Sequence, residues 1–119
     1  MLLSLMRKVL TGKIQKAAKN NPEIGRKLNL RDFVMAIVTI DGKSGIHFIF
    51  KDGKVTSGKG DHPHADARLI WKSGTLAFRV LVSQNDFKMG KALMSRKLTS
   101  EGDVNMILHF KDIAAKAMA

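Results

Sequence analysis

Residues 33–57 read FVMAIVTIDGKSGIHFIFKDGKVTS, and the pattern of these residues decides the fold class. The run 33–40 is continuously apolar and rich in β-branched residues, which is typical of a strand covered on both faces. Residues 46–51 alternate between apolar and polar side chains, as a half-buried strand does. Asp52-Gly53 is a strong signal for a two-residue hairpin turn, so 54–57 returns as a third strand. The stretch therefore predicts an antiparallel meander.

Helices are expected on both sides of this meander. A pattern of period 3.6 predicts an amphipathic helix from Met1 to about Asn20, which the sequence Asn20-Asn21-Pro22 ends. Further along the chain, the patterns predict a strand at 65–71, helices at 73–82 and 86–95, a short edge strand at 97–101, and a helix at 104–118 that Asp103 caps. The segment 73–82 also alternates as a strand would, so periodicity alone leaves both structures open there.

The last helix has a wider apolar surface than one core requires. Its polar residues Asn105, His109, Asp112 and Lys116 fall within a stripe of about 60° at helical spacing, and Lys111 lies outside it. We expect His109, on this stripe, to be solvated. A helix that packs on one core needs an apolar arc of little more than roughly 100°. The remaining surface must therefore be buried on several sides or face a partner, a membrane or a ligand.

The composition describes one ordinary globular domain with a basic beginning. The 119 residues include no cysteine, which excludes disulfides and cysteine-ligated metal sites, and carry a formal net charge of +11. Residues 1–30 hold seven Lys or Arg and one acid, so more than half of the net charge lies in a quarter of the chain. We expect a single domain, 1–119, with a basic helical segment at 1–30 and the sheet and C-terminal helices at 31–119. A basic segment of this kind attracts nucleic acid, anionic lipid headgroups or an acidic protein.

The residues that could carry chemistry do not form a known motif. The segment 61–66, DHPHAD, holds metal-binding residue types, but two histidines around a proline leave the ligand set incomplete, so we expect no bound metal. The sequence contains no G-x-S-x-G, Walker-type phosphate loop or H-E-x-x-H pattern. Nucleic-acid binding is disfavoured because the basic helix carries no aromatic side chain for base stacking. We expect neither an enzyme nor a cofactor.

Three stretches, in this order, resemble the sterol-carrier-protein-2-like lipid-binding family. Residues 46–60, IHFIFKDGKVTSGKG, are similar to the family's strand, Asp-Gly turn and Gly-rich return. Residues 64–81, HADARLIWKSGTLAFRVL, resemble its Ala-Asp-rich strand and a helix centred on a phenylalanine, here Phe78. Residues 91–110, KALMSRKLTSEGDVNMILHF, resemble its final helices and short strand, with Arg96 where a glycine is common. The resemblance favours a helix over a strand in the ambiguous segment.

The resemblance implies an α+β fold with a five-stranded mixed, largely antiparallel sheet, helices on one face, and an apolar tunnel between the sheet and the C-terminal helices. It implies non-catalytic binding or carriage of a lipid-like ligand, such as a fatty acid, fatty acyl-CoA, phospholipid, sterol or isoprenoid. The residues expected to line the tunnel are Phe78, Val82, Phe87, Met94, Met106, Phe110 and Ile113. The alternative is an accessory protein in a lipid or quinone biosynthesis assembly, ahead of a basic nucleic-acid-binding domain.

The basic helix is the expected membrane contact. Lys8, Lys16 and Lys19 lie on or near its solvated face, so they can reach anionic headgroups while the apolar face stays docked. No apolar run approaches the roughly 18–20 residues that span a bilayer, and the charges near the N-terminus argue against a secretory signal. We expect a cytoplasmic protein with peripheral contact to anionic membranes.

Overall fold

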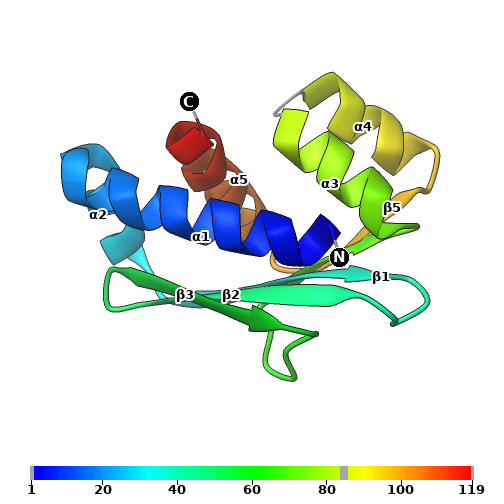
Figure 1. The fold of residues 1–119 in the computed structure, drawn as a ribbon, viewed down its shortest axis with the longest axis horizontal. Helices are drawn as coiled ribbons and strands as arrows, with labels where there is room; N and C mark the ends of the chain where they lie inside the picture. Colours follow the sequence, from blue (N-terminus) through cyan, green and yellow to red (C-terminus); the bar gives the residue numbers. More distant parts are fainter. Residues whose placement is uncertain (1, 84–85, 119) are drawn as a thin grey trace.

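The sheet is built around the apolar run that begins at Phe33. The computed structural model describes residues 2–83 and 86–118. Its strands are β1 (Phe33–Thr39), β2 (Gly45–Lys51), β3 (Lys54–Lys59), β4 (Ala67–Trp71) and β5 (Leu98–Gly102), in the spatial order β3-β2-β1-β4-β5 (Figure 1). Strand β1 pairs antiparallel with β2 and parallel with β4, and β5 is antiparallel to β4. The expected five-stranded mixed sheet is confirmed.

The hairpin between β2 and β3 forms where the sequence predicts it. Asp52 and Gly53 both have positive φ angles, 52° and 76°, as a turn that matches the twist of the strands requires. The backbone N–H of Asp52 donates to the Asp32 carboxylate at 3.0 Å, which ties the turn to the start of β1. Local turn chemistry therefore fixes the register between β2 and β3.

All helices lie on one face of the sheet (Figure 1). They are α1 (Leu2–Asn20), α2 (Pro22–Leu30), α3 (Gly74–Ser83), α4 (Asp86–Met94) and α5 (Val104–Met118). The helix α2 was not predicted, because Asn-Pro was interpreted only as the end of α1. The same residues also begin a helix: the Asn21 side chain accepts the Glu23 N–H at 3.0 Å, and Pro22 occupies the first turn.

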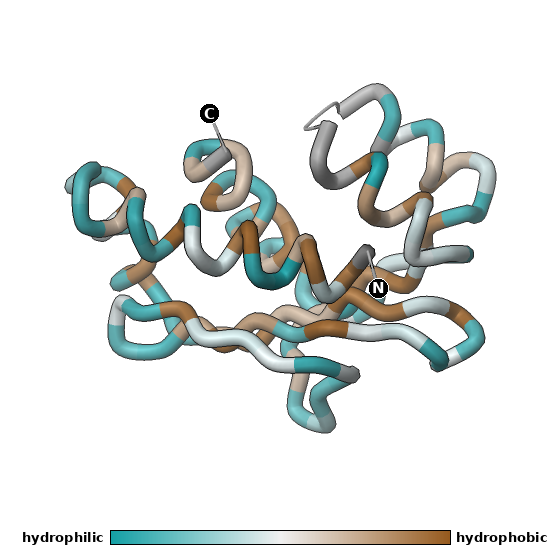
Figure 2. Tube along the Cα trace, viewed as in Figure 1, coloured by the Kyte–Doolittle hydropathy of each residue, from teal (hydrophilic) through white to brown (hydrophobic). Residues whose placement is uncertain are grey.

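The core lies between the sheet and α1, which crosses the middle of the helical layer. Leu3, Met6, Leu10 and Ile14 are buried along one side of α1. A neighbouring side of the helix lies on β3, where the Thr11 hydroxyl donates to Ser57 at 2.8 Å and Gln15 Nε2 donates to the Val55 carbonyl at 3.1 Å. These polar contacts fix the rotation of the helix. Figure 2 shows hydrophobic segments gathered where the helices meet the sheet.

This rotation exposes part of the apolar face expected for the first helix. Leu5 and Val9 are 51% and 41% exposed, although the periodicity assigned both to the docked face. The apolar face of α1 is wider than the part that can pack on the core. The hydrogen bonds from Thr11 and Gln15 to β3 determine which part of this face remains exposed. The first helix therefore presents apolar side chains to solvent among its lysines.

The crossing from β3 to β4 is anchored at Asp66. Its carboxylate accepts the Val34 N–H at 2.7 Å, its own N–H donates to the Val34 carbonyl at 2.9 Å, and its carbonyl accepts the Asp103 N–H at 3.1 Å. Next to it lies Gly102, with a φ of 86°. One residue thus joins the starts of β1, β4 and α5.

Candidate functional site: the layer beneath the C-terminal helices

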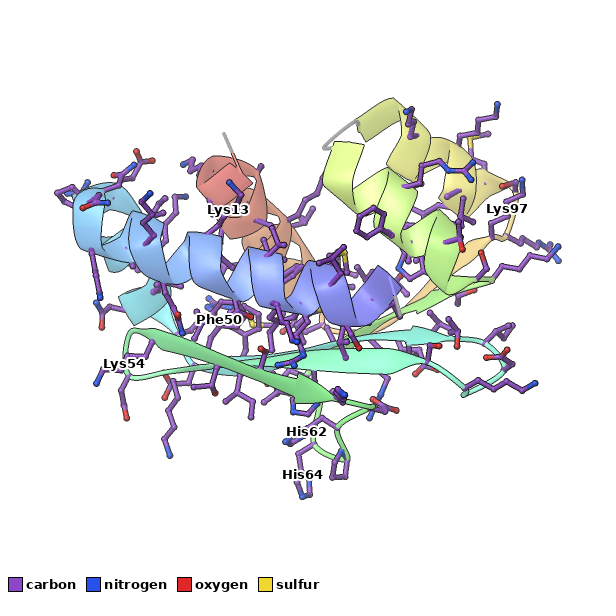
Figure 3. The ribbon with its side chains drawn as sticks, viewed as in Figure 1. Lys13, Phe50, Lys54, His62, His64 and Lys97 are labelled. Atoms are coloured by element: carbon purple, nitrogen blue, oxygen red, sulfur yellow. The ribbon has the colours of Figure 1, made fainter. Side chains whose placement is uncertain are left out.

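The side of α5 that faces the sheet packs on aromatic side chains of β2. Met106, Phe110 and Ile113, which were expected to line a tunnel, are all buried. The Phe110 ring lies 5.4 Å from the Phe48 ring and 6.0 Å from the Phe50 ring, measured between centroids. Figure 3 shows Phe50 between sheet and helices. The structure therefore brings these three expected residues together on the sheet.

The polar stripe of α5 docks on α2. Lys27 forms an ion pair with Asp112, and Lys116 Nζ lies 2.6 Å from Glu23 Oε1. His109 Nε2 donates to the Lys27 carbonyl at 3.1 Å. The expectation that His109 is solvated is therefore wrong, because α2 was not foreseen. Burial lowers the pKa of His109 from its usual value.

The pairing with α2 makes a small, pH-dependent contribution to stability. The hydrogen bond from Lys27 holds the pKa of Asp112 below its usual value of 3.8, so the stabilisation is complete above that value and is lost as the pH falls through the folded-state pKa. Asp112→Asn should lower the free energy of unfolding by no more than about 1 kcal/mol at neutral pH, because the pair is partly exposed. Urea titrations should show the difference shrinking as the pH falls below 3.8 and through the lowered pKa of Asp112.

Glu101→Gln is the matched control for this prediction. It removes one exposed carboxylate from β5 and changes the net charge equally, but it does not touch the contact between α2 and α5. The pairing would be unimportant if both variants showed the same loss of stability at neutral pH.

A third side of α5 carries apolar residues that the core does not use. Val104 and Leu108 are 61% and 57% exposed, whereas the neighbouring Ile107 is half-buried and packed against the core. Helical spacing places Ile107 opposite the polar stripe that α2 covers. Val104 and Leu108 lie on the side of the helix that points away from the buried Met106 and Phe110, so they face solvent. The wide apolar surface that the sequence predicts for α5 is therefore present, and part of it, at Val104 and Leu108, is not buried by packing.

Helices α3 and α4 form a separate arm over the other end of the sheet. Helix α3 packs on α1 and β4, and α4 packs on α3 and β5. Among the described residues, α3 and α5 both pack on α1, and neither is packed along the other. The inner surface of β4 thus lies beneath two helical units that stand apart (Figure 1).

The other expected tunnel residues lie on this arm. Phe78 of α3 is half-buried against the core. The side chains of Val82 and Phe87 lie outside the described residues. Met94 lies at the end of α4 with 88% of its surface exposed, and the structure does not bring it together with Phe110. The tunnel itself stays a prediction.

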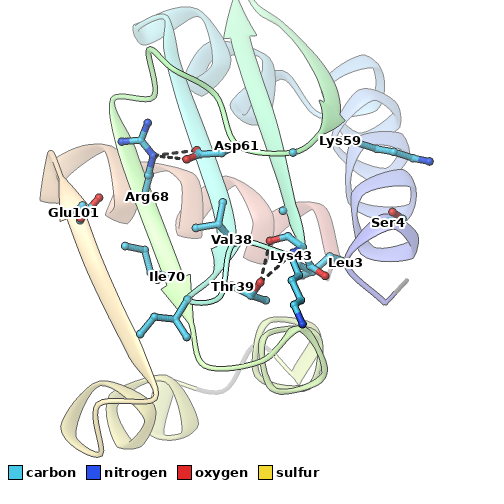
Figure 4. Close-up of a pocket in the computed structure, with 15 residues that line it drawn as sticks. Leu3, Ser4, Val38, Thr39, Lys43, Lys59, Asp61, Arg68, Ile70 and Glu101 are labelled. Atoms are coloured by element: carbon cyan, nitrogen blue, oxygen red, sulfur yellow. Dashed lines mark hydrogen bonds and ion pairs between the residues drawn. The ribbon is translucent and has the colours of Figure 1, made fainter.

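A hollow of about 670 Å³ lies near the ends of β1 and β4, and its lining includes residues on the outer face of the sheet as well as Leu3 and Ser4 of α1 (Figure 4). Val38 and Ile70 contribute apolar surface, and Arg68 Nε donates to Asp61 at 2.9 Å across one side. A second Arg68 nitrogen donates to the His62 carbonyl at 2.7 Å. Sequence reasoning missed this hollow, because it forms only when the loop from β3 to β4 crosses the outer face.

The histidines of that loop lie close together beneath the sheet (Figure 3). The His62 ring is 5.2 Å from the His47 ring and 6.1 Å from the His64 ring, between centroids. His47 Nδ1 donates to the Gly60 carbonyl at 2.9 Å, and His62 Nδ1 accepts the His64 N–H at 3.1 Å. Over residues 2–83 and 86–118, no group of three or more His, Asp or Glu side chains is placed to hold a metal ion.

The lysines expected to meet a membrane are all exposed. Lys8, Lys16 and Lys19 lie on α1, and Lys13 on the same helix points away from the sheet (Figure 3). With the exposed Leu5 and Val9, they form a basic surface with apolar side chains in it. Within the described part of the chain, no helix is both long enough and apolar enough to cross a bilayer.

Solved structures show the same fold. A structure titled "UbiJ-SCP2 Ubiquinone synthesis protein" superposes with a TM-score of 0.67 at 16% identity, covering 96% of this chain and 92% of that one. Sterol Carrier Protein 2 from Yarrowia lipolytica, in its apo form, gives 0.62 at 17% identity, with 95% and 92% covered. Part of the sec-alkylsulfatase Pisa1 from Pseudomonas sp. also matches, at 0.58 and 21% identity, over 75% of this chain and 14% of the enzyme.

The sequence itself identifies the family. No curated protein matches the chain. The family model described as the SCP-2 sterol transfer family matches residues 11–115, which span the second half of α1, the whole sheet and nearly all of the C-terminal helices. The chain therefore belongs to the SCP-2 sterol transfer family.

Proposed function

We propose that the protein binds and carries a lipid-like ligand in the layer between the sheet and its C-terminal helices, without catalysis. The observation that carries this proposal is the apolar surface of α5 that packing leaves exposed, in a helical layer where the described parts of α3 and α5 do not pack along each other. The proposed ligand contacts are Phe78, Val82, Phe87, Met94, Met106, Phe110 and Ile113. Family membership supports lipid binding or transfer as the general activity.

The energetics of an apolar chain favour such a ligand. Burying one methylene contributes roughly 0.8 kcal/mol, so ten methylenes give about 8 kcal/mol before ordering costs are subtracted. Methionine is well suited to the wall, because its flexible and polarisable side chain adapts to chains of different shape. The proposed site therefore selects for length and apolarity more than for one headgroup.

The basic surface of α1 supports a peripheral contact with anionic membranes. Lys8, Lys16 and Lys19 are free to reach headgroups while Leu3 and Leu10 remain buried in the core. Each Lys near an anionic leaflet contributes about 1 kcal/mol, within a Debye length of roughly 8–10 Å. We propose that this helix orients the protein at the cytoplasmic leaflet when a ligand is loaded or released.

Native mass spectrometry of freshly purified protein tests the ligand. We expect a bound lipid of a few hundred daltons that is lost on denaturation, and renewed uptake by the stripped protein. Ile107→Gln, on the side of α5 opposite its contact with α2, should reduce the bound fraction several-fold. Leu30→Gln is the control, because Leu30 is 71% exposed at the end of α2. A protein that carries no lipid, and takes up none, would rule out the proposed function.

A second candidate function is an accessory role in a lipid or quinone biosynthesis assembly. It is favoured by the similarity to the structure titled as a ubiquinone synthesis protein. Extraction and mass analysis of the bound molecule separate the two candidates. An isoprenoid quinone or its precursor would favour the accessory role, and a mixture of fatty acids or phospholipids would favour general carriage.

A further inference from the structure

The single tryptophan holds an unpaired hydrogen-bond donor in the inner layer. Trp71 is the last residue of β4, alternates with the inward Leu69, and is 0% exposed. Its neighbours across the sheet are Thr39 of β1 and Leu98 of β5. Its Nε1 atom is buried, and no residue that the structure describes accepts a hydrogen bond from it.

A buried indole N–H without a hydrogen-bond acceptor is unfavourable, so its presence at position 71 requires an explanation. A buried donor without an acceptor costs about 1–3 kcal/mol, and native proteins pair the great majority of such groups. The indole N–H can only donate, so its partner must be an acceptor. A phenylalanine would supply apolar contact at this position without the cost. Trp71 lies on β4, the strand that both α3 and α5 contact, and this strand lies beneath the proposed ligand layer.

The residues buried in the core indicate whether the acceptor for the Trp71 N–H is charged or neutral. Thr39 is the one polar residue that is buried among the described residues, and its hydroxyl already donates to Asp41 at 2.7 Å. No lysine or arginine among them is buried. A carboxylate or phosphate placed beside Trp71 would lose its hydration without gaining a cation, at a cost of several kcal/mol. A neutral oxygen loses far less on burial.

We propose that the Trp71 Nε1–H donates a hydrogen bond to a neutral oxygen of the bound lipid, an ester or ketone carbonyl, a quinone oxygen or a hydroxyl. This inference rests on the proposed lipid site and narrows its ligand class. It makes Trp71 a specificity-determining residue that favours neutral oxygenated lipids over hydrocarbons of the same length and over free carboxylates.

The indole proton reports the bond directly. Since the chain has one tryptophan, its ¹⁵N–¹H spectrum contains one indole cross-peak. Adding methyl palmitate to lipid-stripped protein should move this peak downfield, as hydrogen-bond formation requires. Hexadecane, which has no oxygen, should bind without that shift. Equal peak positions with both bound ligands would overturn the inference.

The Trp71→Phe variant tests how much the proposed hydrogen bond contributes to ligand affinity. In the parent protein, methyl palmitate should bind about five- to tenfold more tightly than hexadecane because of the additional hydrogen bond. The ratio should fall to about one in the variant, and taking the ratio cancels the change in side-chain volume. An unchanged ratio would overturn the role of Trp71 while leaving the lipid site intact. Failure of the parent to bind either ligand would instead refute the lipid site on which the inference rests.

Discussion

Gly102→Ala should lower the free energy of unfolding by at least about 3 kcal/mol, enough to unfold a marginally stable domain. Gly102 has a φ of 86°, a region that L side chains rarely adopt. An added Cβ would also lie 2.9 Å from the Ala67 Cα and closer still to the Asp66 carbonyl oxygen. Both are backbone atoms, so relief would have to disturb the junction of β1, β4 and α5. Thermal and urea unfolding would measure the loss.

Gly42→Ala separates the cost of the positive φ angle from the cost of the steric clash with the backbone. Gly42 also has a positive φ, 72°, but an added Cβ there meets nothing within 4 Å. Its substitution should cost only the conformational strain, about 1 kcal/mol. If the two variants lost equal stability, the crowding at Asp66 would be unimportant. The anchoring role assigned to that crossing would then be wrong.

Changing Lys8, Lys16 and Lys19 together to Gln should weaken binding to anionic vesicles by roughly 100-fold at low salt. Three lysines at about 1 kcal/mol each give this factor, and the difference should shrink strongly at high salt. All three side chains are exposed on α1, so the substitutions leave the core and the proposed ligand layer intact. Vesicle co-sedimentation with phosphatidylserine and with neutral phosphatidylcholine would measure it.

A second triple variant controls for net charge. Lys43, Lys54 and Lys97 are also exposed, and they lie on the β1–β2 turn, on the β2–β3 hairpin and before β5. Their replacement by Gln lowers the net charge by the same amount but leaves α1 unchanged. The parent affinity should be largely retained. Comparable losses in both variants would show a diffuse effect of charge, and α1 would then be no more than a solvated basic face.

Much of the fold could be predicted because its signals are local. The positive φ angles at Asp52 and Gly53 are what an Asp-Gly hairpin requires, and Asp103 caps α5 by accepting the Asn105 N–H at 2.8 Å. The resemblance also marked Arg96 as standing where a glycine is common. The structure explains that preference, because Arg96 has a φ of 60°.

The remaining features depend on contacts between distant segments. The polar stripe of α5 could not be assigned to α2 before α2 was known, because a stripe facing solvent and a stripe facing another polar helix have the same periodicity. The exposure of Leu5 and Val9 follows from the side-chain bonds of α1 to β3, which no helical pattern reveals. The tunnel depends on how closely α3 approaches α5, a distance that no local residue pattern specifies.

The central position of α1 affects the order in which the core is completed as the chain is synthesised. Helix α1 precedes every other described element in the chain and packs against α5, which follows them all. Until α5 has been synthesised, the side of α1 that carries Leu3, Met6 and Leu10 has no complete surface to cover it. The nascent chain therefore displays a basic amphipathic helix, a form that adheres to anionic membranes. We therefore expect the growing polypeptide to contact an anionic bilayer before α5 has packed against α1.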